Sequence, residues 1–238
     1  THSTQTAMEG TFTIGGTSPD FATFTDATSA LMTFGVCNAV TFNVRGGTYT
    51  ERIDLGDVIG SSAQNTITFQ ADAANTASVD VEFNATQSSE DGTLLLQGTS
   101  YITFDGINIE ALNGGGLATA VWIKQGTDVT FKNGNIATAQ TATNDYTTYI
   151  EGTDHMMLSN VEISNGYMGV YAYGNSSAAD TGLTIHDVTV NNAYYAGLYL
   201  YYFEDISVMN CKADLRTNGQ YQYSYGIYCY AYYSNNVV

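Results

Sequence analysis

A short unit of sequence recurs from about residue 100 onward, and this repeat limits the folds open to the chain more than any other feature. The anchors of successive units lie 27, 27, 27 and 23 residues apart: Phe104, Phe131, Leu158, Ile185 and Val208. In each unit apolar and polar residues alternate, two polar residues intervene, and a second alternation follows. Alternation with a period of two predicts strands with one buried face. A unit this short cannot bury an apolar face alone, so the repeat predicts stacked coils around a continuous core.

A third strand is predicted upstream of the anchor in each coil. The corresponding segments are 94–98, 121–124, 148–152, 170–174, 198–201 and 227–230, which begin 22 to 29 residues apart. Leucine-rich repeats have similar periods, but their LxxLxLxxN phrase is absent. Three short strands per coil are typical of a parallel β-helix. We therefore expect an all-β protein of that architecture.

The two-residue break between the first two strands of each unit predicts a tight corner. Its second position is occupied in turn by Gly106, Asn133, Asn160, Asp187 and Asn210. Glycine, asparagine and aspartate are the residues that adopt a left-handed backbone at low cost. Stacked coils would align Asn133, Asn160, Asp187 and Asn210 in a structural ladder, in which each amide bonds to the coil above.

The N-terminal half repeats less cleanly, with strands predicted at 11–14, 40–44, 67–69 and 79–83. One helix is predicted between the first two, where Thr23 and Asp26 form a short capping box and Gly35 can end the helix. Its apolar residues follow at helical spacing: Phe24, Ala27, Leu31 and Phe34. We expect residues 1–50 to form a strand and a helix that caps the open end of the core. Residues 51–238 are expected to form the β-helix coils, which continue beyond residue 238.

The formal charge is −17 at pH 7, and only six residues are basic. Such a chain cannot neutralise a run of phosphates, so nucleic acid is excluded as a partner. Anionic membranes and polyuronate chains are disfavoured for the same reason, unless bound cations bridge the charges. No apolar run reaches about 20 residues, so membrane insertion through a helix is not expected. The start at Thr1, without Met and without a basic-then-apolar leader, fits a mature secreted or cell-surface protein.

Three segments near the N-terminus carry a family resemblance: Gly10–Gly16, Asp20–Ala27 and Val40–Glu51. They resemble the N-terminal segment of pectin-lyase-like right-handed parallel β-helix proteins. Their sequence pattern is also similar to that of large secreted, adhesin-like surface proteins of the Bacteroidota type, which are exported by type IX secretion. The resemblance covers essentially the whole chain and implies a right-handed coil. It implies no particular activity, because this fold hosts polysaccharide lyases, hydrolases, adhesins and phage tailspikes.

No catalytic constellation is evident in the sequence. Lys124 and Lys132, the candidates for a lyase base, lie in no acidic cluster, and Glu151 and Glu162 are candidates for a glycosidase pair only by residue type. The Asn-Thr-Asp, Asp-Asp, Gly-His and Arg-Ile-Lys motifs of the fold's hydrolases are absent, as are GxSxG and HExxH. We therefore expect no catalytic residues.

Metal and cofactor sites are also not indicated. His155 and His186 lie near predicted strand ends, where solvated turn residues are expected. Cys37, Cys211 and Cys229 show no metal-ligand spacing and are expected to be buried structural residues. Without a DxDxDG loop, Ca²⁺ is only weakly indicated, and no other cofactor is expected.

The third strand of each coil carries the most informative functional feature. Its alternation directs residues such as Leu198, Leu200, Ile227 and Cys229 inward and leaves two aromatic columns outside. We call these eight residues the aromatic strip: Trp122, Tyr149, Tyr171, Tyr199 and Tyr228 in one column, and Tyr173, Tyr201 and Tyr230 in the next. Leu95 begins the first column, and further tyrosines extend the edges of the strip: Tyr194, Tyr195, Tyr202, Tyr232 and Tyr233.

Three interpretations of the aromatic strip remain open. Ring stacking can simply stabilise the sheet, by about 0.2–1 kcal/mol per cross-strand pair. An exposed aromatic surface of this size also suits a protein interface or the docking of sugar rings. We expect a non-enzymatic, extracellular, adhesin-like β-helix that presents this face to another protein or another segment of the same long chain. The alternative is a polysaccharide-active enzyme (lyase or hydrolase) or a carbohydrate-binding module of the same fold.

Overall fold

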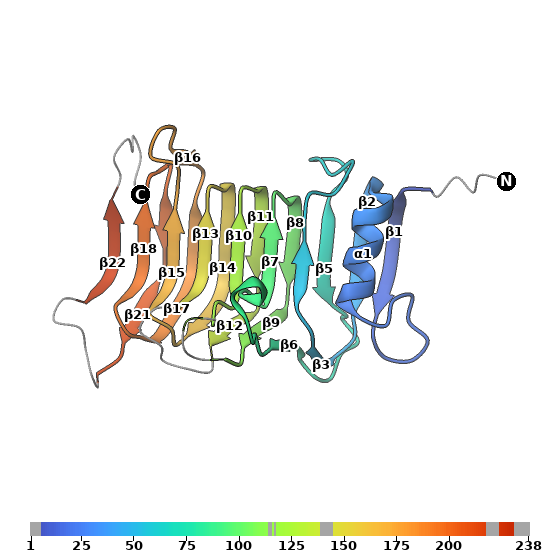
Figure 1. Ribbon diagram of the computed structural model, residues 1–238, viewed down its shortest axis with the longest axis horizontal. Coiled ribbons are helices and arrows are strands. Elements are labelled where there is room, and N and C mark those ends of the chain that lie inside the picture. Colours follow the sequence, from blue (N-terminus) through green and yellow to red (C-terminus); the bar gives the residue numbers. More distant parts are fainter. Residues whose placement is uncertain (1–5, 114–115, 117, 139–144, 218–223, 231–238) are drawn as a thin grey trace.

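The computed structural model describes residues 6–113, 116, 118–138, 145–217 and 224–230, and nearly all elements in these ranges are β-strands. The strands stack side by side into an elongated solenoid, with β1 at one end and β22 at the other (Figure 1). All strand pairs are parallel, as a solenoid requires. In the part of the chain that the structure describes, no helix is long and apolar enough to cross a membrane.

Three faces run along the solenoid. Face 1 consists of β1 (Met8–Ile14), β2 (Val36–Val44), β5 (Ile67–Ala71), β8 (Ser100–Asp105), β11 (Thr127–Lys132), the first halves of β14 (Asp154–Ser164) and β17 (Thr184–Ala193), and β20 (Ser207–Met209). Face 2 consists of β3 (Gly47–Thr50), β6 (Val79–Phe83), β9 (Ile107–Ala111), β12 (Asn135–Thr138), the second halves of β14 and β17, and β21 (Lys212–Leu215).

Face 3 consists of β4 (Ile53–Leu55), β7 (Leu94–Gln97), β10 (Val121–Lys124), β13 (Tyr146–Glu151), β15 (Met168–Tyr173), β18 (Ala196–Tyr201) and β22 (Tyr225–Tyr230). The remaining elements are the helix α1 (Phe24–Phe34), the short 3₁₀ turn η1 (Ser88–Glu90), and the pair β16 (Asp180–Thr181) and β19 (Phe203–Glu204). This arrangement confirms the expected all-β, right-handed parallel β-helix with three strands per coil and a short N-terminal helix.

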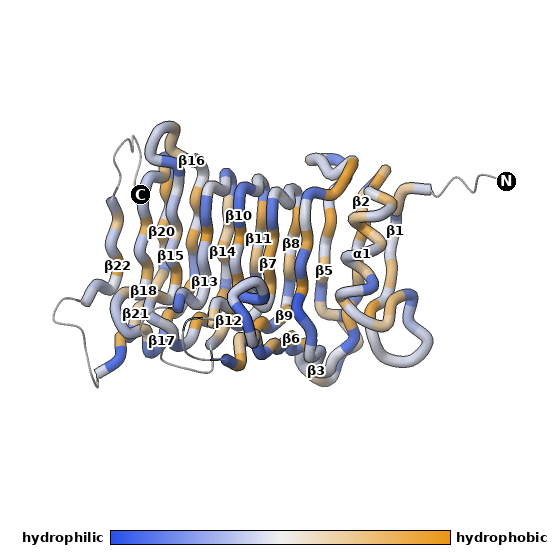
Figure 2. The backbone as a smooth tube through the Cα atoms, viewed as in Figure 1, coloured by the Kyte–Doolittle hydropathy of each residue, from blue (hydrophilic) through white to orange (hydrophobic). Residues whose placement is uncertain are grey.

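The core is a column of inward side chains that the strand register superimposes. Hydropathy alternates along strands such as β8 and β11, so one side of these strands is apolar (Figure 2). On face 1 the rings of Phe42, Phe69, Phe104 and Phe131 lie in register, with successive centroids 4.5, 5.2 and 6.3 Å apart. All four are at most 1% exposed. Burying each such ring stabilises the fold by about 1.5–3 kcal/mol.

The corners between faces 1 and 2 contain the residues predicted for a ladder. Asn133, Asn160, Asp187 and Asn210 all have φ between 52° and 57°, in the left-handed region. Asn133 Nδ2 donates to Asp105 Oδ1 at 2.7 Å, and Asn160 Nδ2 donates to Asn133 Oδ1 at 3.0 Å. Asn210 Nδ2 donates to Asp187 Oδ1 at 3.3 Å. The side chains that permit the corner backbone therefore also connect neighbouring coils.

A second asparagine column lies where face 2 ends. Asn165 and Asn192 have φ values of 71° and 62°. Asn192 Nδ2 donates to Asn165 Oδ1 at 2.7 Å, and Asn165 Nδ2 donates to the Thr138 carbonyl at 2.6 Å. The repeat pattern in the sequence did not predict this column.

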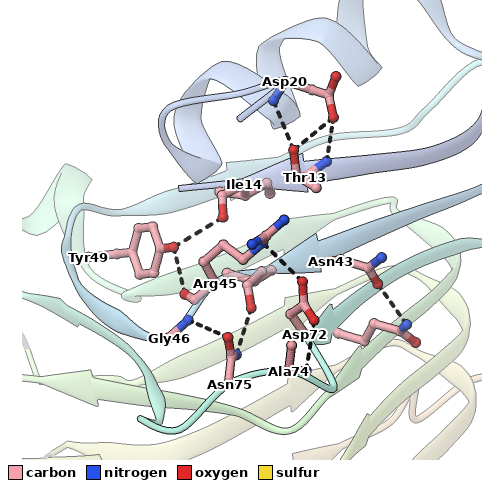
Figure 3. A network of polar contacts seen from close by, with 12 residues as sticks. Thr13, Ile14, Asp20, Asn43, Arg45, Gly46, Tyr49, Asp72, Ala74 and Asn75 are labelled. Carbon is pink, nitrogen blue, oxygen red and sulfur yellow. Dashed lines mark hydrogen bonds and ion pairs between the residues drawn. The ribbon is translucent and has the colours of Figure 1, made fainter. Parts of the chain in front are cut away.

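In the N-terminal coils, the corner between faces 1 and 2 is held by a polar network (Figure 3). Arg45 Nε lies 2.9 Å from Asp72 Oδ2. The Asn75 amide accepts from Gly46 N at 2.8 Å and donates to the Val44 carbonyl at 2.9 Å. These bonds join consecutive coils here in place of a ladder.

The helix α1 begins and packs largely as expected. Thr23 Oγ1 accepts from Asp26 N at 3.0 Å, and α1 buries Phe24 and Leu31 against the core. It contacts β4, the edge strand of face 3, and β1, the edge strand of face 1. The Glu51 carboxylate, which the sequence did not indicate, accepts from the backbone N–H groups of Phe24 and Thr25 at 3.0 and 2.8 Å. An anion at this position also complements the helix dipole.

The expected burial fails at Ile227, Cys229 and Cys37. Ile227 and Cys229 are register partners of the buried Leu198 and Leu200, as the inward placement requires. Ile227 is nevertheless 50% exposed and Cys229 is exposed, because β22 is the last strand of face 3 in the described residues and none of these residues packs beyond it. Cys37 is exposed rather than buried, since it lies where the pairing of β1 with β2 shifts register. Cys211 is half-buried.

Substitutions at Asn133 separate the backbone role of the ladder from its hydrogen bonds. Asn133→Gly keeps the left-handed backbone but removes the bonds to Asp105 and Asn160, each worth about 0.5–1.5 kcal/mol. Asn133→Ala removes the same bonds and adds the left-handed strain of an L-residue, about 1 kcal/mol. Urea unfolding should therefore rank wild type above glycine and glycine above alanine. An alanine variant as stable as the glycine variant would contradict this account.

Thr148 allows a test of how much an unpaired hydroxyl in the core destabilises the fold. It is fully buried between Val121 and Val170, and its hydroxyl has no hydrogen-bond partner among the described residues. Thr148→Val keeps the shape and removes an unpaired polar group, so we expect a gain of about 1 kcal/mol in unfolding free energy. Thr103→Val, on the outer side of β8, is the control and should change stability by less than about 0.5 kcal/mol. Destabilisation by Thr148→Val would refute the expectation.

Candidate functional site

The aromatic strip lies on the outer side of face 3, where the register aligns its residues across five strands. Trp122, Tyr149, Tyr171, Tyr199 and Tyr228 are consecutive register partners from β10 to β22. Tyr173, Tyr201 and Tyr230 are partners from β15 to β22. Period-two alternation with buried neighbours such as Val170 and Ala172 accounts for this outward placement.

The rings of the strip stack on one another along the solenoid axis. Centroids lie 5.3 Å apart for Trp122 and Tyr149, 5.2 Å for Tyr149 and Tyr171, and 4.6 Å for Tyr199 and Tyr228, with interplanar angles of 19°, 26° and 12°. In the second column, Tyr201 and Tyr230 are 5.0 Å apart at 28°. Tyr171 and Tyr199, between these pairs, are tilted at 46° with centroids 5.9 Å apart. Because most ring faces contact a neighbouring ring, we infer that the strip presents mainly ring edges and phenolic hydroxyls.

One end of the strip is covered. Leu95, the register partner of Trp122 in β7, is only 6% exposed. Trp122 lies against Tyr149 on β13, and the Lys124 ammonium lies 3.5 Å from its ring centroid. Trp122 Nε1 is buried without a hydrogen-bond partner among the described residues, and Gly92 lies close to the Cβ atoms of both Trp122 and Leu95. Leu95 is therefore buried, whereas Trp122 is half-buried, as Tyr149 is.

Further tyrosines widen the strip. Tyr146 lies 4.6 Å from Tyr171 and 5.3 Å from Tyr149, although alternation placed it inward. Thr147 and Thr148 are both buried, so the alternation breaks there, and no sequence signal marked this. Tyr225 also lies beside the aromatic strip, although the sequence did not mark it. Among the predicted edge residues, Tyr195 packs on Tyr199 and Tyr225. Tyr202 packs on Tyr173, and Tyr194 packs on Tyr167. Tyr232 and Tyr233 lie outside the described residues.

Burial raises the pKa values of three phenols of the strip, those of Tyr149, Tyr171 and Tyr199. Burial, reinforced by the nearby Glu151 carboxylate, raises the pKa of Tyr149 to about 12. Burial also raises the pKa values of Tyr171 and Tyr199 far above the usual value, with neighbouring phenols adding to the effect. At neutral pH these three side chains are therefore uncharged rings with polar tips.

One group of residues looks like a nucleophile relay but lacks its geometry. Ser159 Oγ lies 3.5 Å from His186 Nδ1, and Asp187 Oδ2 lies 3.0 Å from the same nitrogen. A Ser-His-Asp relay needs the acid on one ring nitrogen and the hydroxyl on the other. His155 Nδ1 lies 3.7 Å from Asp128 Oδ1 near the same face and is well exposed.

The candidate acids and bases from the sequence do not come together. Glu151 lies on face 3 and Glu162 on face 2, so they do not flank one substrate bond. Lys132 forms an ion pair with Asp105 at 3.1 Å, and Lys124 lies over Trp122. Within the described ranges, no group of three His, Cys, Asp or Glu side chains is placed to hold a metal ion.

Comparisons with known proteins identify the fold. No protein-family model and no curated protein sequence matches this chain. A rhamnogalacturonan lyase structure superposes with a TM-score of 0.63 at 12% identity, over 93% of this chain and 62% of the lyase, so the chain spans less than two thirds of that protein. Two structures of the pectin methylesterase from Aspergillus niger give TM-scores of 0.55 and 0.54 at 16% and 15% identity, over 98% of this chain and 92% of theirs.

At these identities the likeness shows a pectin-lyase-like β-helix fold and nothing finer. A relation to Bacteroidota surface proteins and export by type IX secretion remain predictions.

The raised phenol pKa values predict a pH dependence of stability. Since the folded-state pKa of Tyr149 is about 12 and the unfolded value is about 10, the folded chain holds a proton that the unfolded chain releases. The resulting stability is fully present below about pH 10 and is lost as pH rises through about 12. Phenolate absorbance should show a set of tyrosines ionising late, with one fewer in Tyr149→Phe. Ionisation of all tyrosines together near pH 10, with the fold intact by circular dichroism, would contradict the prediction.

Proposed function

We propose that this chain is a non-catalytic extracellular β-helix of adhesin-like or structural type, and that its aromatic strip binds a protein surface. The observation that carries the proposal is the stacking of the strip's rings along the solenoid axis. The partner is another protein or another segment of the same long chain.

The stacking geometry favours a protein over a sugar. A sugar ring docks on the open face of an aromatic ring, but here neighbouring rings of the first column lie 4.6 to 5.9 Å apart, stacked except at the tilted Tyr171–Tyr199 pair. Ring edges with hydroxyl tips remain, and tyrosine supplies contact area and a hydrogen-bonding group at low entropy cost. Such a surface resembles the tyrosine-rich contact surfaces of binding proteins more than a sugar platform.

The low charge of the aromatic strip also favours a protein as its partner. Lys124 and Glu151 adjoin the aromatic columns, and Tyr173, Tyr201 and Tyr230 continue the second column without charge. The core of a protein interface is depleted of charge and enriched in aromatic residues. The acidic surface elsewhere on the chain keeps the protein in solution while this face engages a partner.

The catalytic alternative rests on the solved structures of similar fold, whose names are those of pectin-active enzymes. A polysaccharide lyase or hydrolase would need a base and a cation site, or a pair of carboxylates on one face. A carbohydrate-binding module that used the aromatic strip would need open ring faces there. The alternative therefore has the support of fold but not of the strip's geometry.

Oxidative footprinting tests the proposal directly. Hydroxyl radicals should label Tyr171 and Tyr199 at least about twofold less in the protein on its producing cells than in the isolated chain, because a bound partner excludes solvent. Tyr101, a partly exposed tyrosine of β8, is the matched control and should react equally in both settings.

Three results would overturn the proposal. Equal labelling of Tyr171 and Tyr199 in both settings would show that nothing covers the strip. Glycan binding that both Trp122→Ala and Tyr199→Ala abolish would assign the strip to sugars. Release of products from polygalacturonate, methyl-esterified pectin or rhamnogalacturonan would assign catalysis to the chain.

A further inference from the structure

Face 2 carries a polar depression that lies outside the aromatic strip. Two cavities of about 520 and 350 Å³ open on this face, and both are lined by Asn135. The larger extends over β12, β14, β17 and β21, and the smaller over β3, β6, β9 and β12. We call this continuous surface the polar trough. It crosses the strands at right angles and so runs along the solenoid axis.

The register lines the polar trough with hydrogen-bonding groups at a constant repeat. One column of outward residues consists of Asp80, Asn108, Asn135, Glu162, Thr189 and Lys212. Successive members lie on neighbouring strands, about 4.8 Å apart. Amide, carboxylate and hydroxyl groups therefore follow one another in a straight row, which presents both donors and acceptors to a chain lying along it.

Part of this hydrogen-bonding capacity is used within the row. Asn108 Nδ2 donates to Asp80 Oδ1 at 2.7 Å, and Asn108 Oδ1 accepts from the backbone N–H of Asn135 at 2.9 Å. Asn191 Nδ2 donates to Glu162 Oε1 at 2.7 Å. These bonds orient the side chains and pre-organise the row for a ligand.

The middle of the polar trough keeps groups available for a ligand. Among the described residues, neither the side-chain amide of Asn135 nor the carboxylate of Glu110 has a hydrogen-bond partner. Glu110 is also the register partner of Glu82, and like charges directly opposite each other on a sheet are destabilising. Glu82 already accepts from Thr50 Oγ1, and a hydroxyl donor from a ligand would satisfy Glu110.

The charge of the polar trough restricts the ligand. Asp80, Glu82, Glu110 and Glu162 line it, and its one ammonium group, on Lys212, is paired with Asp214. Uronate and phosphate chains are repelled by such a surface. The substrates named for the solved structures of similar fold are thus not the ligands that this surface selects.

A protein partner does not fit the polar trough either. Its apolar lining residues, Val81, Ile109 and Val161, are at most 2% exposed and offer no anchor. Protein interfaces draw most of their affinity from buried aromatic and apolar anchors. We propose that the polar trough binds an uncharged polysaccharide chain, which lies along the solenoid axis and donates hydroxyl hydrogen bonds to Glu110 and Glu162 while it accepts from Asn135.

Affinity electrophoresis in gels containing a single polysaccharide tests this site. The probes are xyloglucan and galactomannan, which are neutral, polygalacturonate, which is anionic, and chitosan, which is cationic. We expect at least one neutral probe to retard the protein, at low and at high salt alike. Asn135→Ala and Glu110→Ala should each weaken that binding at least about fivefold, equivalent to about 1 kcal/mol.

Two controls separate the polar trough from the other faces. Thr68→Ala, on the outer side of face 1, and Tyr199→Ala, in the aromatic strip, should leave the binding unchanged. Asn135 is exposed and its side chain has no partner among the described residues, so Asn135→Ala should unfold in urea like wild type.

Several outcomes would overturn the proposal. Failure of both neutral probes to bind would do so, as would retardation by polygalacturonate. Retardation by chitosan alone, lost at high salt, would show mere charge attraction. Binding that Tyr199→Ala abolishes and Asn135→Ala spares would move the sugar site to the aromatic strip and overturn the proposed function as well, whereas loss in Asn135→Ala alone leaves that function standing.

Discussion

The backbone hydrogen bonds between successive coils hold this molecule together, and they join parallel strands along each face, from β1 to β20 on face 1 and from β4 to β22 on face 3. A single coil has three short strands and cannot enclose a core, so each coil depends on its neighbours for both hydrogen bonds and burial. The register also places each side chain above its counterpart, about 4.8 Å away. The phenylalanine column of the core, the asparagine column of the corners and the tyrosine columns of face 3 all follow from this constraint.

Aligning identical side chains on neighbouring coils destabilises the fold wherever those side chains are polar or ionisable. At the corners the cost is small, because an asparagine amide both donates and accepts, and Asn133 bonds to coils on either side. On face 3 the aligned phenols shield one another, which keeps Tyr149, Tyr171 and Tyr199 neutral. On face 2, Glu82 accepts from Thr50 Oγ1, but the carboxylate of its register partner Glu110 has no hydrogen-bond partner in the described residues, and the proposed ligand would supply one.

The three faces thus differ in chemistry although they share one geometry. Face 1 carries polar pairs such as Asp105 with Lys132, face 2 carries carboxylates and amides, and face 3 carries aromatic rings. The fold is shared with pectin-active enzymes, but the side chains on each face decide what the solenoid contacts. Two faces with unlike chemistry allow one chain to engage a protein on one side and a neutral glycan on another.

The sequence by itself did not mark β3, β4, β16 or β19, but it determined most strands of the repeated coils, their corners, the N-terminal helix and the two aromatic columns. Each of these depends on a local pattern: a period of two, an Asn or Gly at a tight corner, or a Thr before a helical run. Only the tertiary structure decided what lies over an outward side chain and which distant residues meet. The covering of Leu95 beside Gly92, the outward turn of Tyr146, the Glu51 cap on α1 and the Asn165–Asn192 column are of this kind. The polar trough is the largest example, because alternation shows that Asp80, Asn108 and Asn135 point outward, whereas only the coil-to-coil register brings them into one row.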